Sequence, residues 1–134
     1  MSAVRYDGIH CHFEFERPAP GVVVMRISGR DVGELGDAPL QELTRDFAGG
    51  RPVELFVDAR NVQGASIDVS NEWARWLRAN RSRFATVNML TGSRYIEITA
   101  GFVRRFAEMD QVMRIYTDGA AFDEALAASV AAAC

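Results

Sequence analysis

The sequence contains no lysine, because all 15 of its basic residues other than histidine are arginine. This absence excludes chemistry that needs a lysine amine, such as Schiff-base catalysis or the phosphate-binding lysine of a Walker loop. Acidic residues number 18, and the formal net charge is −3 at pH 7. A mildly acidic chain has no bulk attraction for nucleic acid, so we expect no nucleic-acid partner.

Cysteine and long hydrophobic runs are also scarce. The two cysteines, Cys11 and Cys134, are too few for a disulfide scaffold. Residues 1–7 are short and polar, unlike a signal peptide, and no apolar run approaches the roughly 20 residues that span a bilayer. We therefore expect a reduced, cytoplasmic protein without stable membrane insertion.

The pattern of apolar residues predicts a single α/β domain over residues 1–134, with residues 1–8 as a flexible N-terminus. The expected strands cover residues 9–16, 22–28, 53–59, 85–90 and 113–117. The expected helices cover residues 38–47, a segment from residue 68, a segment from residue 93 to about 109, and residues 120–132. This order, ββαβαβαβα, predicts a mixed, mostly parallel sheet with packed helices.

The central feature is the stretch from Val53 to Leu77. Residues 53–59 are almost continuously apolar, which is typical of a strand buried on both faces. We expect the residues from Asn61 to Ser66 to form a loop, and Asp68 or Ser70 to cap the helix that follows. Ligands and partners of open α/β sheets bind beyond the carboxyl ends of such strands, although the segment also fits a plain connection.

Helical periodicity assigns faces to the predicted helices. In the helix from residue 68, Trp73 and Trp76 fall on the apolar side, whereas Arg75 and Arg78 point away. In the helix from residue 93, the expected inner face comprises Tyr95, Ile98, Thr99, Phe102, Val103, Phe106 and Met109. For the helix over residues 38–47, Asp37 is the expected cap.

Arginines gather in the second half of the chain. Between residues 73 and 107 the only acidic residue is Glu97, and the arginines there are Arg75, Arg78, Arg81, Arg83, Arg94, Arg104 and Arg105. They fit either an anionic partner, such as an acidic protein surface, a nucleotide or phospholipid head groups, or a solvated outer helix face. The turn of Thr91, Gly92 and Ser93 fits helix capping or anion binding through backbone N–H groups.

Few residues suggest catalysis or metal binding. His10 and His12 share one face of the predicted strand, and imidazoles suit zinc or copper, but Cys11 points to the other face and no third ligand follows. We expect no metal and no cofactor. Asp58 and the adjacent Arg60 are expected to form a structural ion pair. The sequence shows no combination of nucleophile, general base and general acid around Asp58, so we expect no enzymatic activity.

Several stretches together resemble the STAS domain, found in bacterial anti-sigma factor antagonists and in the tails of sulfate transporters. The resemblance covers residues 22–128. It rests on VVVMRISG at residues 22–29, VELFVDARNV at 53–62, VRRFAEMDQVMRI at 103–115 and TDGAAFDEAL at 117–126.

The resemblance implies a non-catalytic bacterial signalling module that binds a protein partner, such as an anti-sigma factor or kinase. Members switched by a kinase carry Asp-Ser-Ser-Gly at the start of the second helix. That motif is absent here, and Ser66 and Ser70 are the candidate phosphorylation sites in the matching stretch. The predicted partner-binding residues are Asn61, Gln63, Gly64, Ser66, Asp68, Arg75 and Arg78.

Two alternatives from other classes remain. One is a domain that binds a small ligand, a lipid or a nucleotide, with the strand ends and the arginines. The other is a homo-oligomer, such as a dimer, in which the strand over residues 9–16 pairs with a second copy of itself.

Overall fold

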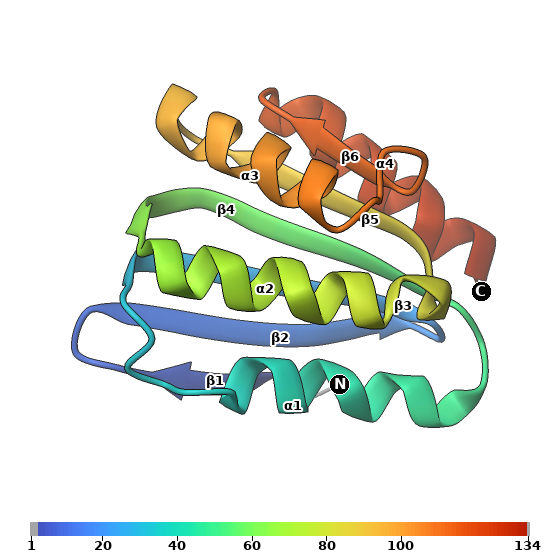
Figure 1. The fold of residues 1–134 in the computed structure, drawn as a ribbon. Coiled ribbons are helices and arrows are strands. Elements are labelled where there is room, and N and C mark those ends of the chain that lie inside the picture. The colour runs from blue at the N-terminus through green and yellow to red at the C-terminus, as the bar shows by residue number, and fades with distance from the viewer. Residues whose placement is uncertain (1–2, 134) are drawn as a thin grey trace.

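The computed structural model describes residues 3–133. Two predictions involve residues outside this range. The predicted flexible start includes Met1 and Ser2, and the second of the two cysteines is Cys134. The chain forms one six-stranded sheet in the order β1-β2-β3-β4-β5-β6, so strands that follow each other in sequence are also neighbours in space (Figure 1). The strands are β1 (Val4–Asp7), β2 (Cys11–Ala19), β3 (Val22–Asp31), β4 (Val53–Ala65), β5 (Phe84–Thr91) and β6 (Met113–Tyr116).

The sheet is mixed, as predicted. β1, β2 and β3 pair antiparallel, whereas β3, β4, β5 and β6 pair parallel. Parallel neighbours need crossover connections, and each crossover contains a helical segment. These segments and the last helix are α1 (Ala38–Thr44), η1 (Arg45–Gly49), α2 (Ile67–Ala79), η2 (Arg81–Arg83), α3 (Arg94–Phe106) and α4 (Gly119–Ala133).

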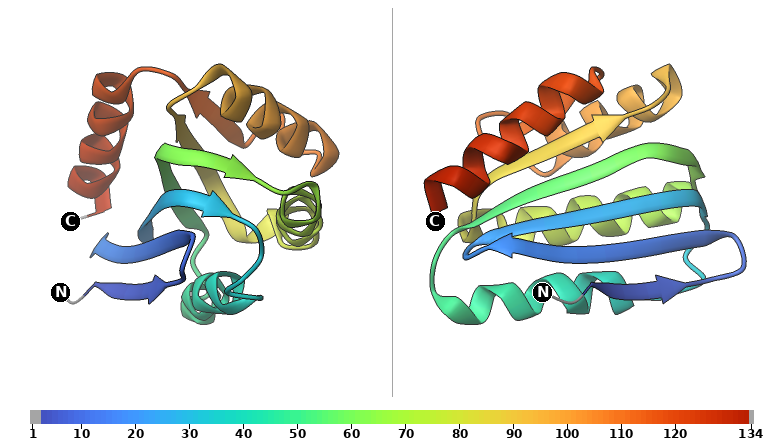
Figure 2. Two further views of the ribbon diagram at one scale, coloured as in Figure 1. Left: turned by 90° about the vertical axis from the view of Figure 1, so that its left-hand side faces the viewer. Right: turned by 180° about the vertical axis from the view of Figure 1, so that it is seen from behind.

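The helices divide unequally between the two faces of the sheet. α1, α2 and α3 cover one face and α4 lies alone on the other, as the view along the sheet in Figure 2 shows. The large core on the first face includes Phe13, Leu55 and Leu77. The small core under α4 is built from Phe122 against Val24, Phe56 and Leu90. This division fits the nearly continuous apolar run of β4, which is covered on both sides.

The prediction of a flexible N-terminus is wrong for Val4–Asp7. These residues form β1 and pair with β2, from Val4 opposite Phe15 to Asp7 opposite His12, so the element order gains a strand at its start. Only Val4 and Tyr6 alternate in this short segment, which gives too little pattern for a strand to be recognised. Because β1 occupies one side of β2 and β3 the other, β2 is not an edge strand. Self-association by pairing of residues 9–16 is therefore also a wrong prediction.

The predicted loop after the central strand is wrong as well. Residues 61–65 continue β4, because β3 extends to Asp31 and supplies backbone partners as far as Ala65. Ser66 caps α2, and its Oγ accepts a hydrogen bond from the Val69 N–H at 3.2 Å. Asp68 and Ser70, the predicted caps, lie within the first turn of the helix. Asp37 precedes α1 without a side-chain capping bond.

The predicted inner face of the third helix is largely wrong. Ile96, Ala100 and Val103 are buried against the sheet, whereas four of the predicted inward residues are exposed: Tyr95, Ile98, Phe102 and Phe106. Val103 and Met109 are buried as predicted. α3 has apolar residues on two sides, and periodicity alone selected the bulkier set instead of the one that faces the sheet.

Candidate ligand cavity and interaction surface

A cavity of about 100 Å³ lies between the sheet and the helix pair α2 and α3. Its lining runs along the sheet from Asp31 and Ala65, at the carboxyl ends of β3 and β4, to Leu77 and Met113 toward the other end. Its walls are the inward sides of the two helices, represented by Val69 and Trp73 of α2 and by Ile96 and Ala100 of α3. The crevice predicted beyond the central strand is thus a hollow beneath two helices and contains no loop.

The local sequence explains why the cavity lining is apolar. The 3.6-residue stripe of α2 turns Val69, Trp73 and Leu77 toward the sheet, and α3 does the same with its smaller residues Ile96 and Ala100. Alanine at the centre of α3 leaves space that a larger side chain would occupy. The floor comes from inward residues of the strands, among them Met25, Leu55, Val57, Val87, Met89 and Met113.

Three polar residues line the same cavity: Asp31, Ser70 and Thr99. Asp31 ends β3 and is 9% exposed, and its Oδ1 accepts a hydrogen bond from the Gly33 N–H at 3.1 Å. Burial raises the pKa of the Asp31 carboxyl above its usual value. The Thr99 hydroxyl donates to the Tyr95 carbonyl at 3.0 Å, so it is already satisfied within the helix.

An unfilled volume of this size is unfavourable for folding. Protein interiors are packed as densely as organic crystals and leave few voids larger than a water molecule. The cost measured for apolar cavities, about 24 cal/mol per Å³, corresponds to about 2 kcal/mol for a cavity of about 100 Å³. A stable domain can tolerate this loss, but such a hollow is also what a binding pocket requires.

The outer side of α3 is a second unusual feature. Tyr95, Ile98, Phe102 and Phe106 are 60%, 61%, 58% and 44% exposed. The rings of Phe102 and Phe106 stack with their centroids 6.5 Å apart. We call these four residues the α3 stripe. Their spacing follows the helical period, so the four large apolar side chains lie on one side of α3 and are exposed to water.

The arginines predicted as a group are only partly free. Arg78 and Arg81 both bind Glu108, at 2.6 and 3.2 Å, and Arg83 lies over the Phe47 ring, 5.6 Å from its centroid. Arg104 approaches Asp110 at 3.8 Å. Among the described residues, those of the group that form no ion pair and are exposed are Arg75, Arg83, Arg94 and Arg105, and Arg83 is engaged by the Phe47 ring.

The predicted partner-binding residues do not share one surface. Asp68, Arg75 and Arg78 are exposed on α2. Asn61 lies on the other face of the sheet, beside Asp58 in a polar groove. Gln63 is exposed on β4, whereas Gly64 is buried and Ser66 is half-buried as the α2 cap. Only the α2 members are therefore available to one partner together with the α3 stripe.

The turn before α3 is occupied by structural contacts. Ser93 caps α3 by accepting a hydrogen bond from the Ile96 N–H at 3.2 Å. Thr91 is buried, and its hydroxyl donates to the Tyr116 carbonyl at 3.3 Å. Gly92 packs so closely on the Arg60 carbonyl that no side chain would fit. Anion binding at this turn stays a prediction.

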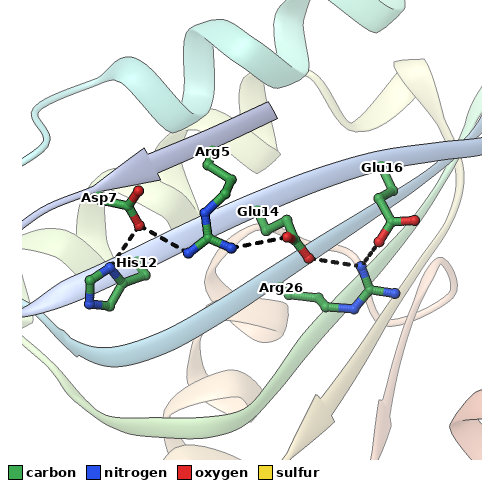
Figure 3. Close-up of polar contacts among 6 residues, drawn as sticks. All are labelled: Arg5, Asp7, His12, Glu14, Glu16 and Arg26. Atoms are coloured by element: carbon green, nitrogen blue, oxygen red, sulfur yellow. Dashed lines mark hydrogen bonds and ion pairs between the residues drawn. The ribbon is translucent and has the colours of Figure 1, made fainter. Parts of the chain in front are cut away.

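The part of the sheet that α4 leaves uncovered carries a connected set of charges (Figure 3). Arg5 binds Asp7 and Glu14 at 3.2 and 3.1 Å, and Arg26 binds Glu14 at 3.4 Å and also contacts Glu16. These pairs link β1, β2 and β3 across the sheet. They are solvent-exposed, so each contributes little to stability, and they keep this face polar.

The two histidines are engaged separately. His12 Nδ1 lies 2.8 Å from Asp7 Oδ1, whereas His10 Nδ1 lies 3.3 Å from Glu34 Oε2. Within residues 3–133, no cluster of three or more His, Cys, Asp or Glu side chains is arranged to hold a metal ion.

Asp58 and Arg60 form the predicted pair, with Arg60 Nε 3.0 Å from Asp58 Oδ1, and Arg60 also reaches Asp123 of α4 at 3.4 Å.

Sequence reasoning missed both the cavity and the α3 stripe. The available signal was the composition of α3, which contains more apolar residues than one face can hold. Ile96, Ala100 and Val103 satisfy the helical spacing as well as the bulkier Tyr95, Ile98 and Phe102 do.

None of the described helices has the length and apolarity required to cross a membrane.

Comparison with known proteins provides a structural match only. No family model matches the chain, and no curated protein matches it. Among the solved structures that match is the crystal structure of an uncharacterized protein of the DUF3478 family from Shewanella loihica, described as having a SpoIIAA-like fold. The TM-score is 0.65 at 14% sequence identity, and the match covers 90% of this chain and 98% of that chain. The chain therefore has the SpoIIAA-like fold, in agreement with the single α/β domain that the sequence predicts.

Proposed function

We propose that this protein is a non-catalytic regulatory module that binds a protein partner through the outward sides of α2 and α3. The observation that supports this most is the α3 stripe, a row of large apolar side chains exposed to water. The STAS-like fold is consistent with an anti-sigma-antagonist-like role, although fold alone does not determine function.

The chemistry of the surface defines the partner. Arg75 on α2 and Arg94 and Arg105 on α3 are exposed on the two helices that form this surface. A buried apolar centre with a charged rim is the usual composition of a protein interface, and aromatic residues and arginine are its commonest energetic anchors. The partner we expect presents an apolar patch bordered by carboxylates.

Phosphorylation of Ser66 provides a means of control. Ser66 is the N-cap of α2, where the helix dipole and the free N–H groups stabilise a negative charge. A phosphate there would add charge close to Asp68 and would change how α2 meets a partner. Ser70, the other predicted serine, lines the cavity and is half-buried like Ser66.

The test is affinity capture from the native host, with mass spectrometry on both bait and prey. We expect one stoichiometric partner for the wild-type protein and its loss in the double variant Ile98→Glu and Phe102→Glu. Ala127→Glu, at an exposed position of α4, is the matched control and should retain the partner. The same spectra report whether Ser66 carries a phosphate.

Two results would contradict the proposal. One is a captured protein that binds the double variant as well as it binds the wild type, because the stripe would then be irrelevant to recognition. The other is the absence of any stoichiometric partner. Light scattering on the same variants tests whether the partner is a second copy of this chain, because a homodimer that uses this surface would become a monomer in the double variant.

A further inference from the structure

The cavity reaches the surface at one end. Of the residues that line it, seven are half-buried and the others are buried; the seven are Ile27, Val62, Ala65, Ser70, Trp73, Met89 and Thr99. They lie in the carboxyl halves of β3, β4 and β5 and in the first half or at the middle of α2 and α3. The opening therefore lies at the strand ends, and the deeper part extends toward Leu77 and Met113.

Water is a poor occupant of the deep part. A buried water needs two to four polar partners, and the deep lining is formed by apolar side chains such as Leu55, Val87 and Val103. The Thr99 hydroxyl is already hydrogen-bonded within α3. The other two polar residues of the lining, Asp31 and Ser70, both lie toward the open end. The site is thus dry inside and polar at its entrance.

We infer that this cavity is a binding site for a small uncharged ligand with a hydrocarbon body, such as an alkyl chain end or a single ring, and a hydrogen-bond donor at its outer end. The donor faces the Asp31 carboxylate and the Ser70 hydroxyl. This site goes beyond the proposed function, because the residues that line it are on the sides of α2 and α3 that face the sheet, and none of them belongs to the α3 stripe.

The volume limits the size of the buried part. An engineered apolar cavity of about 150 Å³ binds benzene, so a cavity of about 100 Å³ accommodates a ring or a chain of roughly six carbons once its walls adjust. Met25, Met89 and Met113 are among those walls. Methionine is flexible and polarizable, and it adapts readily to ligands of different shape.

The charge at the entrance limits the chemistry of the head. A ligand carboxylate or phosphate placed beside Asp31 would meet a like charge in a partly buried position. An arginine that could neutralise such a head is absent from the residues that line the cavity. A nucleotide is therefore excluded on both size and charge, and an alcohol is favoured over the acid of the same chain length.

The test is a titration followed by amide chemical shifts in ¹H–¹⁵N spectra, with benzene, 1-hexanol, hexanoate and monodecanoylglycerol as probes. We expect saturable shifts at the amides of α2, α3 and the ends of β3 and β4. At pH 7, 1-hexanol should bind at least tenfold more tightly than hexanoate. If monodecanoylglycerol binds more tightly than 1-hexanol, the natural ligand is the acyl chain of a lipid. If 1-hexanol binds more tightly, the natural ligand is a free small molecule.

Variants that fill the cavity make the site assignment decisive. Ala100→Leu adds a branched side chain in the centre and should weaken 1-hexanol binding more than tenfold. Ala65→Val, a residue that suits a strand, narrows the entrance and serves if the first variant does not fold. Ala128→Leu, exposed on α4, should bind as the wild type does. Any of three results would overturn the inference. The chemical shifts could fail to saturate as ligand is added, the filled variants could bind 1-hexanol as tightly as the wild type does, or the wild type could bind 1-hexanol and hexanoate with equal affinity.

Discussion

At the scale of single residues, Glu34 holds the turn between β1 and β2 in place. Its Oε1 accepts hydrogen bonds from the N–H groups of His10 and Cys11 at 2.7 and 3.0 Å, and its Oε2 accepts one from Ile9 at 3.2 Å. These bonds, with that from the His10 N–H the strongest, lower the pKa of the Glu34 carboxyl to about 2. A carboxylate that accepts several backbone bonds is stabilised in its charged form.

The lowered pKa predicts a specific pH dependence of stability. Because the folded-state pKa lies below the unfolded one, the stabilisation is complete above about pH 4.5 and is lost as the pH falls toward about 2. Glu34→Gln should therefore destabilise the protein at pH 7, and the difference from the wild type should shrink below pH 4. Urea unfolding at several pH values measures this. A difference that stays constant down to pH 3 would show that the charge is not responsible.

Gly29 is a second residue whose identity is fixed by its surroundings. Its φ is +87°, and a Cβ there would overlap the His10 carbonyl oxygen. Gly29→Ala should cost more than about 2 kcal/mol, because it combines backbone strain with a clash against main-chain atoms. Gly36 has φ +60° with open space around it, so Gly36→Ala should cost only about 1 kcal/mol. Equal unfolding midpoints for the two variants would contradict this reasoning.

At the scale of elements, the start of α2 couples stability to the proposed control by phosphorylation. The Ser66 hydroxyl caps the helix, and loss of such a cap costs about 1 kcal/mol. We expect Ser66→Ala to lower the free energy of unfolding by that amount and Ser66→Asp to lower it by less, because aspartate also caps. Ser70→Ala is the control for serine removal within the helix. Chemical denaturation that ranks Ser66→Asp below Ser66→Ala would contradict the capping role.

Sequence patterns predicted most elements but not all of their faces. The strands from Val53, Phe84 and Met113 were recognisable within a residue or two, because their apolar runs are short and bounded by turn residues. The continuation of β4 to Ala65 was not, since Asn61 and Gln63 resemble a loop and only the extended β3 gives them backbone partners. Local pattern reports burial, whereas strand length depends on pairing with a distant segment.

A site beyond the carboxyl end of the central strand stays a prediction, and the cavity only begins at that strand end, at Ala65. The carboxyl end of the central strand was identified from fold topology alone. The hollow beneath α2 and α3 depends on how small residues such as Ala100 pack against Val87 and Met113, which no local spacing encodes. Likewise, α3 offers two apolar stripes, and only its docking on the sheet decides which one remains exposed.

At the scale of the whole molecule, the hydrophobic cores on the two faces of the sheet differ in size but are built on the same strands. The large core contains Trp73 and Trp76 packed on one side, and the small core depends on α4 alone. Because β4 contributes Leu55 to one core and Phe56 to the other, neither can unfold without disturbing the strand common to both. The domain should therefore unfold in one cooperative step.

Phe122 tests that coupling. It is fully buried, with its ring centroid 5.8 Å from those of both Phe56 and Tyr116, and truncation of such a residue costs about 3–5 kcal/mol. For a chain of this size we expect Phe122→Ala to lower the Tm by about 15 °C. Tryptophan fluorescence, which reports the opposite face, should shift by the same amount as far-UV circular dichroism. The half-buried Leu126 on the same helix provides the control, and Leu126→Ala should cause a smaller shift. If fluorescence kept the wild-type Tm while α4 melted early, the two layers would be independent, because the strands would hold the large core without their second cover.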